Sequence, residues 1–176
     1  MTRRGTIATL LLVAATAALA TVPAAPAPAA GCRGQGNADA APAVQERAML
    51  CLVNKARKAR GLGPLDAVGS LARAAGRKSG DILRCDEFSH EACGREFTYW
   101  IERVGYRACS AAENIAWGTG ALGTPRSIFR AWMRSPGHRR NILGDYEDIG
   151  IGLRIGELEG TRGAHVWTQQ FGSRNC

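Results

Sequence analysis

The chain has 176 residues, 45% of them hydrophobic, and a formal net charge of +8 at pH 7. This length and apolar content fit one globular domain with its own core, and no second apolar block could seed another domain. The positive charge could indicate a nucleic-acid partner, but the arginines are scattered and no basic stretch rich in aromatic residues stands out. We therefore expect one domain and no nucleic-acid partner.

The first 30 residues have a composition of their own. Arg3 and Arg4 precede an uncharged run over residues 7–20, and a Pro/Ala-rich stretch follows over 22–30. A charged start, an apolar middle and a small-residue end are typical of a secretory signal peptide, and we expect cleavage near residues 20–29. Because the run is too short and too rich in alanine to span a membrane comfortably, the mature chain should be extracellular and without a transmembrane span.

A lipidated N-terminus is the alternative, because Ala29-Ala30-Gly31-Cys32 resembles a lipidation box. The large aliphatic residue usually expected three positions before such a cysteine is missing. Lipidation of Cys32 would also leave an odd number of cysteines outside the cell. We favour the exported chain without a lipid.

The domain has six cysteines, at Cys32, Cys51, Cys85, Cys93, Cys109 and Cys176. An even number after an export signal indicates a disulfide framework. No two have the CxxC spacing of a zinc knuckle or a thioredoxin motif, which argues against structural zinc and redox catalysis. We expect Cys85 to pair with Cys93, because the two bracket Phe88-Ser89-His90, and Cys176 to hold down a C-terminal strand.

Helical patterns dominate the first part of the domain. After a loose Gly/Ala-rich leader over 31–41, an amphipathic pattern predicts a helix from Pro42 to about residue 60. A second helix is expected over 70–83, capped by Ser70, and a third over 95–104. A fourth opens at Thr124-Pro125, and Ser135-Pro136 repeats that start signal for a short fifth helix.

Strand patterns follow the helices. Residues 111–117 form a short hydrophobic segment that ends in the turn Gly118-Thr119-Gly120. Two strands are predicted over 148–155 and 164–171. Helices first and strands later, without an internal repeat or linker, predict an α+β layered domain over residues 42–176.

Only three histidines are present, His90, His138 and His165. His90 is expected in the loop between the second and third helices. His138 is the third residue of the short fifth helix, whose N-terminus disfavours the imidazolium, so we expect a neutral ring. His165 should lie at an edge position before the last strand, in a structural role. Glu113 stands in an apolar segment and must find a partner, since an unpaired buried charge is costly.

Several motifs resemble those of the CAP superfamily, the SCP-like extracellular domains of cysteine-rich secretory, antigen-five and pathogenesis-related proteins, in its bacterial type. They run in one order over residues 44–172: Leu52-Val53-Asn54-Lys55-Ala56-Arg57, Gly61-Leu62-Gly63-Pro64-Leu65, Phe88-Ser89-His90, Glu113-Asn114-Ile115-Ala116, Trp132 to Leu143, Ile149-Gly150-Ile151-Gly152 and Trp167-Thr168-Gln169. Any one of these motifs is weak, whereas their combination in order is specific.

The resemblance implies an α-β-α sandwich in which helices flank a small antiparallel sheet around a cleft, sometimes with a divalent cation such as zinc. By motif, His90, Glu113 and His138 carry over as cleft residues and candidate metal ligands. A second glutamate of the eukaryotic members corresponds to Ser135 here, so the four-residue cavity is incomplete. Two imidazoles and a carboxylate are still a sensible zinc set with an open position for water. A hydrogen-bonded cluster without metal is the alternative.

These features predict a secreted, monomeric CAP-domain protein that binds a lipid, a wall component or another protein without catalysis. The alternative is a metal-dependent hydrolase of peptides or cell-wall polymers, although the chain has no HExxH motif and no catalytic residue can be assigned. A third interpretation is a scaffold whose polar cleft only holds the fold together. Without Arg3 and Arg4 the charge is roughly +6, a weak indication of anionic partners.

Overall fold

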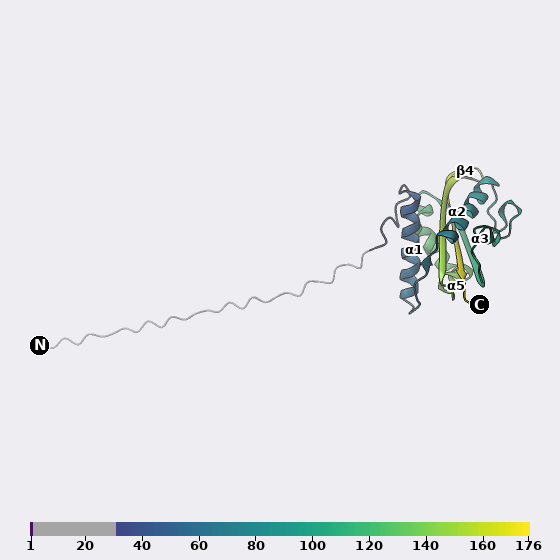
Figure 1. Ribbon diagram of the computed structural model, residues 1–176. Coiled ribbons are helices and arrows are strands. Elements are labelled where there is room, and N and C mark those ends of the chain that lie inside the picture. Colours follow the sequence, from purple (N-terminus) through teal and green to yellow (C-terminus); the bar gives the residue numbers. More distant parts are fainter. Residues whose placement is uncertain (2–30) are drawn as a thin grey trace. The chain divides into compact units, whose positions relative to one another are not determined.

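Three layers, a sheet between two sets of helices, make up the part of the protein that the computed structural model places (Figure 1). The structure describes Met1 and residues 31–176, so the predicted signal peptide lies outside the described residues. Residues 31–176 form one unit. No helix in this part of the chain is both long and apolar enough to span a membrane.

The middle layer is a four-stranded sheet of strand order β1-β3-β4-β2. Its strands are β1 (Asp66–Ala67), β2 (Ser110–Thr119), β3 (Asp148–Leu158) and β4 (Thr161–Ser173). β4 pairs antiparallel with both β2 and β3. β1 pairs parallel with β3, so the sheet is mixed and the expectation of an antiparallel sheet is correct for only three strands. A two-residue strand is too short to produce the alternating pattern by which strands are recognised.

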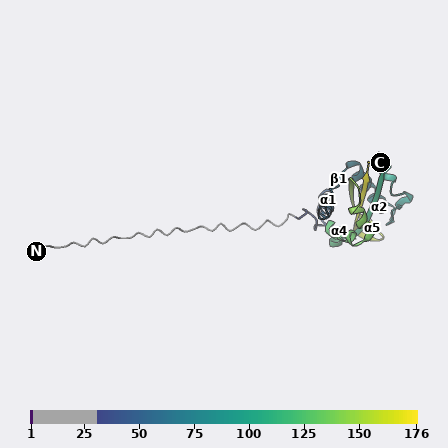
Figure 2. The ribbon, with the colours of Figure 1, turned by 90° about the horizontal axis from the view of Figure 1, so that it is seen from below.

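Five α-helices and two short 3-10 helices surround the sheet: α1 (Pro42–Lys58), α2 (Gly69–Arg84), η1 (Ala92–Gly94), α3 (Tyr99–Arg103), η2 (Gly120–Gly123), α4 (Pro125–Arg134) and α5 (Pro136–Leu143). α1 and α4 lie on one side of the strands and α2 on the other (Figure 2). The side chains of α5 join those of α1 and α4 in one core. This α+β arrangement confirms the predicted α-β-α sandwich.

Alternation along the strands builds a core on each face of the sheet. Ile149, Ile151 and Leu153 of β3 pack with Trp132 of α4 on one face. The other face of β3 presents glycines, and a Cβ atom at Gly150 would lie 2.0 Å from the carbonyl carbon of Leu71. The backbone of α2 therefore lies directly on β3, which only residues without side chains permit.

The helix ends differ from the expectations in two places. α2 begins at Gly69 with Val68 as N-cap, and the expected cap by Ser70 is wrong. The third helix has only five residues rather than the predicted 95–104, since the backbone at Arg95 is extended rather than helical and its side chain forms an ion pair with Asp81. At α4 the expected cap is confirmed, since Thr124 accepts a hydrogen bond from the backbone N–H of Ser127.

Three disulfides fasten the fold, Cys32–Cys51, Cys85–Cys93 and Cys109–Cys176. The pairing of Cys85 with Cys93 is confirmed, and Cys176 ties the end of the chain to the start of β2. Residues 31–41 contain no helix or strand. They do not lie loose, because Cys32 is bonded to α1 and Gln45 donates to the carbonyl oxygens of Ala38 and Ala40.

Candidate functional site

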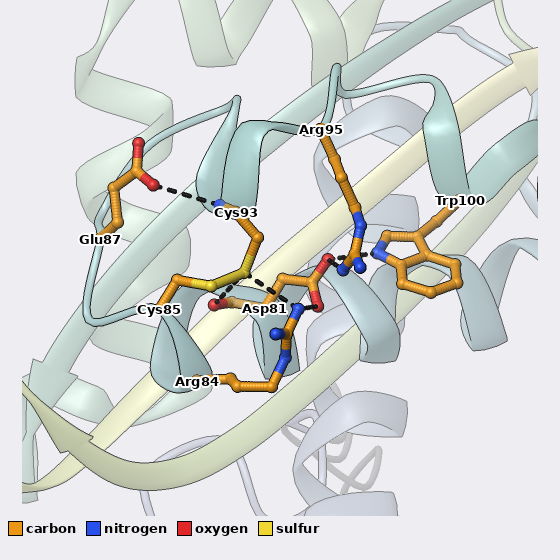
Figure 3. Close-up of a disulfide and its surroundings, with 7 residues drawn as sticks. All are labelled: Asp81, Arg84, Cys85, Glu87, Cys93, Arg95 and Trp100. Atoms are coloured by element: carbon orange, nitrogen blue, oxygen red, sulfur yellow. Dashed lines mark hydrogen bonds and ion pairs between the residues drawn. A yellow bond between two sulfur atoms is a disulfide. The ribbon is translucent and has the colours of Figure 1, made fainter.

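His90 lies on a loop between α2 and η1 that is fastened at several points. The Cys85–Cys93 disulfide closes the loop, and the backbone N–H of Cys93 donates to Glu87 Oε2 at 3.1 Å (Figure 3). The ammonium group of Lys78, on α2, donates a hydrogen bond to the carbonyl oxygen of His90. Lys78 is only 1% exposed. The loop therefore holds His90 in one place relative to the sheet.

A buried carboxylate, Asp81, anchors the outer part of this loop (Figure 3). It accepts hydrogen bonds from Arg84 at 2.8 Å, Arg95 at 2.6 Å and Trp100 at 2.7 Å. Burial acts to raise the pKa of Asp81, but the three donors outweigh it and hold the pKa below its usual range. Asp81 is thus a fully satisfied anion with a structural role.

Glu113 of β2 lies beneath His90. Its Oε1 is 2.7 Å from His90 Nδ1, and its Oε2 accepts a hydrogen bond of 2.5 Å from Gln170, the residue opposite it on β4. The Glu113 side chain is only 1% exposed. Burial raises the pKa of Glu113, and His90, Lys78 and Gln170 reduce this rise without cancelling it. The partner that the sequence required for Glu113 is therefore His90, aided by Gln170.

His138 occupies the third position of α5, and its ring lies beside Trp132 with 6.4 Å between the ring centroids. Its Nδ1 is buried and has no hydrogen-bond partner among the described protein atoms. Burial lowers the pKa of His138, and the nearby His90 lowers it further. A lowered pKa agrees with the expected neutral ring, but burial rather than the helix N-terminus is its main cause.

The two histidines flank one surface hollow of about 610 Å³. Its lining consists of Phe88, Ser89, His90, Glu91, Ile115 and His138. Glu113 is not part of the lining and acts from beneath through His90. The hollow lies at β2, which is an edge strand of the sheet. The structure thus places His90 and His138 around one space and Glu113 under it.

A network of side-chain amides fixes the start of α5 to β2. Asn114 donates to the carbonyl oxygen of His138 at 3.2 Å and to Gln169 Oε1 at 3.0 Å. Asn141 in turn donates to Asn114 Oδ1 at 2.9 Å. Because amide networks of this kind are costly to leave half satisfied, His138 is held in position by residues that do not enter the hollow.

Two residues of the site, Lys78 and Gln170, were not recognised from the sequence. Lys78 falls on the apolar face of α2, four residues after Ala74 and four before Ile82, and a lysine there is a signal that could have been used. Gln170 stands in a run of buried residues in β4. Such a residue needs a buried partner, but the sequence does not name it.

His165 lies away from the hollow. It is 7% exposed and sits in β4, an inner strand, so the expected edge position is wrong. Its ring nitrogens are 3.1 Å from the carbonyl oxygen of Gly163 and 3.0 Å from that of Ala38. These contacts join the start of the domain to the sheet and assign His165 a structural role.

The three candidate ligands do not form a metal site in this arrangement. Within the described residues no group of three or more His, Cys, Asp or Glu side chains is placed to hold a metal ion. Both oxygens of Glu113 already have partners. Ser135, at the position of the second glutamate, caps α5 without a side-chain hydrogen bond. Zinc binding stays a prediction from the resemblance, and no step below uses a metal.

The fold and the paired histidines define the chain as an SCP-like domain, and comparison with known proteins gives the family. The model of the CAP, cysteine-rich secretory protein family matches residues 50–171. The chain therefore belongs to the CAP family. The uncharacterised protein YkwD of Bacillus subtilis is 34% identical over 129 residues, which cover 72% of this chain and 46% of YkwD. The chain thus spans about half the length of this relative.

Solved structures show the same fold at low sequence identity. An outer surface protein of Borrelia burgdorferi has a TM-score of 0.62 at 20% identity, over 72% of this chain and 90% of that protein. An extracellular SCP-domain protein of Bacillus anthracis has a TM-score of 0.62 at 22% identity, over 77% of this chain and 44% of that one. These likenesses establish the α-β-α sandwich.

Proposed function

We propose that this protein is a secreted CAP domain that binds a small amphipathic ligand in the hollow between His90 and His138 and does not catalyse a reaction on it. The observation that carries the proposal is the lining of the hollow. Phe88 and Ile115 offer apolar surface beside the imidazoles of His90 and His138. Apolar surface with a few convergent polar groups is the usual composition of a ligand site.

The polar groups of the hollow favour a ligand that carries hydroxyl or amide groups. His138 lines the hollow, and no hydrogen bond among the described residues involves its Nε2, which is not among the buried unpaired atoms, so this nitrogen can donate to or accept from a ligand. Phe88, 38% exposed, provides a ring face for the apolar side of such a ligand. A fragment of a cell-wall polymer has this combination of groups, and we propose it as the ligand class.

Hydrolysis is the second candidate, and the contacts favour it less. A hydrolase needs a nucleophile next to a base, or a metal-bound water. The hydroxyl of Ser89 accepts the N–H of Glu91 at 3.0 Å, and within residues 31–176 no hydrogen bond joins it to an imidazole. Glu113 has no free oxygen with which to act as a base.

Three observations support the proposed export of the protein. Three disulfides fit an oxidising compartment. Two proteins with similar structures are named as an outer surface protein and an extracellular protein. The apolar N-terminal segment, which is expected to be a signal peptide, also indicates export.

Calorimetric titration of the mature chain with soluble cell-wall fragments tests the proposal, with a short-chain fatty acid as the lipid probe. We expect heat with the wall fragments and a loss of about fivefold in affinity for His138→Ala, since one hydrogen bond to a ligand contributes about 1 kcal/mol. Phe88→Ala should weaken binding as well. Leu122→Ala is the matched control, because Leu122 is an exposed apolar residue that does not line the hollow.

Two results would overturn the proposal. Equal affinities of wild type, His138→Ala and Phe88→Ala would show that the ligand binds elsewhere. Cleavage of wall polymers or peptides that stops both with a chelator and in His90→Ala would establish the metal-dependent hydrolase instead.

A further inference from the structure

A long stretch of the chain carries only positive charge. Residues 114–144 contain five arginines and no lysine, aspartate or glutamate: Arg126, Arg130, Arg134, Arg139 and Arg140. Elsewhere the same domain mixes the two signs, since all its carboxylates lie outside this stretch. The charge of the domain is therefore concentrated, although the total of roughly +6 for residues 31–176 is moderate.

The fold displays these arginines on two consecutive helices. Arg126, Arg130 and Arg134 follow one another at intervals of four along α4, so they lie on one helix face and about 6 Å apart. Ser135 ends α4 and begins α5, which carries Arg139 and Arg140. All five arginines are exposed, and the only other exposed residues of the two helices are Ala131 and Pro136. We call this set of five the arginine face.

The guanidinium groups of the arginine face have no partner in the domain. No ion pair or side-chain hydrogen bond among the described residues involves any of the five. Some arginines elsewhere form ion pairs with carboxylates, as Arg174 does with Asp148 and Arg95 with Asp81. Arg139 and Arg140 also line a surface hollow of about 410 Å³ with Pro136 and Leu143.

We propose that the arginine face binds a linear polymer that carries a phosphate group in each repeat. Guanidinium groups pair with phosphate oxygens through two parallel hydrogen bonds. Charges repeated along α4 and continued on α5 fit a chain of anions better than a single one. This surface goes beyond the ligand hollow of the proposed function and does not depend on it.

The apolar residues favour a polymer over a membrane. A helix that binds at a lipid surface inserts Trp, Phe or Leu side chains into the headgroup region. Of the large apolar residues of α4, Ile128 and Trp132 are instead buried, and Phe129 and Met133 are partly buried against the same core. None of the exposed large hydrophobic residues of the described chain lies on α4 or α5. The arginine face therefore offers charge without an apolar anchor.

The test measures binding of fluorescently labelled, long-chain inorganic polyphosphate to the mature protein over a series of salt concentrations. The test variant is Arg130→Gln/Arg134→Gln/Arg139→Gln/Arg140→Gln. We expect its affinity to fall about 100-fold at low salt, and the slope of log K against log salt to decrease by roughly 3 in magnitude, since each phosphate contact releases a counterion. Orthophosphate at the same phosphate concentration should compete poorly.

The matched control is Arg33→Gln/Arg73→Gln/Arg103→Gln/Arg107→Gln, which removes the same charge from exposed arginines outside the face. It should keep most of the affinity. An equal loss in both variants would overturn the proposal, because net charge alone would then explain binding. Tighter binding to phosphatidylglycerol vesicles than to polyphosphate would identify a membrane partner instead, and orthophosphate competing equally would show a site for a single anion.

Discussion

Two buried carboxylates lie under the same disulfide-closed loop, and their pKa values are shifted in opposite directions. Asp81 accepts from two guanidinium groups and an indole N–H, and its pKa is lowered. Glu113 accepts from an amide and contacts one imidazole, and its pKa is raised. Both side chains are at most 6% exposed. Both carboxylates are therefore buried to a similar degree, and the number and charge of their hydrogen-bond donors decide which one is stabilised as an anion.

The comparison separates a structural residue from one able to change its protonation. Asp81 lies where the loop is attached to α2 and α3, and it stays ionised over the ordinary pH range. Glu113 lies under the hollow and holds His90, so a proton gained or lost there changes the hydrogen bonding of the candidate ligand site. Titratable groups with perturbed pKa values concentrate at functional sites, and of these two carboxylates only Glu113 contacts a residue that lines the hollow, His90.

Removal of the satisfied anion should have the largest effect. Asp81→Ala leaves Arg84, Arg95 and Trp100 without their acceptor, and we expect a loss of about 2–3 kcal/mol in the free energy of unfolding at pH 7. Urea denaturation followed by circular dichroism measures it. Because the folded pKa is lowered, this contribution is present above the unfolded pKa and is lost as the pH falls through the folded one.

Glu102→Ala is the control for that measurement. Glu102 is an exposed acid of α3 without a side-chain partner among the described residues, so its loss should change stability by less than about 0.5 kcal/mol. Similar losses for both variants would show that Asp81 does not anchor the loop.

Lys78→Met should have an intermediate effect. The change removes the hydrogen bond to the carbonyl oxygen of His90 and a buried cation whose charge lowers the pKa of Glu113. We expect a loss of about 2 kcal/mol, partly offset because methionine is buried without the cost of desolvating an ammonium. Faster hydrogen exchange of the loop amides around His90 would accompany it. The exposed Lys58, changed to Met in the same way, should have no such effect.

Glu113→Gln should give the smallest change at pH 7, about 1 kcal/mol or less, and should sharpen the comparison through its pH dependence. A raised folded pKa means that the folded state holds its proton more tightly, so wild-type stability falls as the pH rises from the usual value of 4.5 through the folded pKa. The glutamine variant should lack this fall. Parallel stability curves for the two proteins over this range would contradict the assignment to Glu113.

Local signals in the sequence were sufficient for much of the fold. The amphipathic pattern of α1, the Thr124-Pro125 start of α4 and the bracketing of Phe88-Ser89-His90 by two cysteines each act over a few residues. Such signals need no knowledge of distant contacts. The order of the motifs along the chain was enough to indicate the CAP family.

The errors and omissions concern contacts between distant residues. β1 exists only because it pairs with β3, which lies some 80 residues later in the chain. Arg95 was expected in a helix and instead bonds to Asp81 of α2. Lys78 and Gln170 take part in the site because they meet His90 and Glu113 in space, and neither shares a motif with its partner.

The sequence by itself determined the family, the class of the fold, one disulfide and the identity of the two histidines, because periodicity, capping and motif order are properties of short segments. Only the tertiary structure decided that Glu113 lies beneath the hollow with both oxygens engaged, and that the five arginines of α4 and α5 are exposed without a partner among the described residues. These facts depend on burial and on which side chains meet, and both arise only when remote segments pack together.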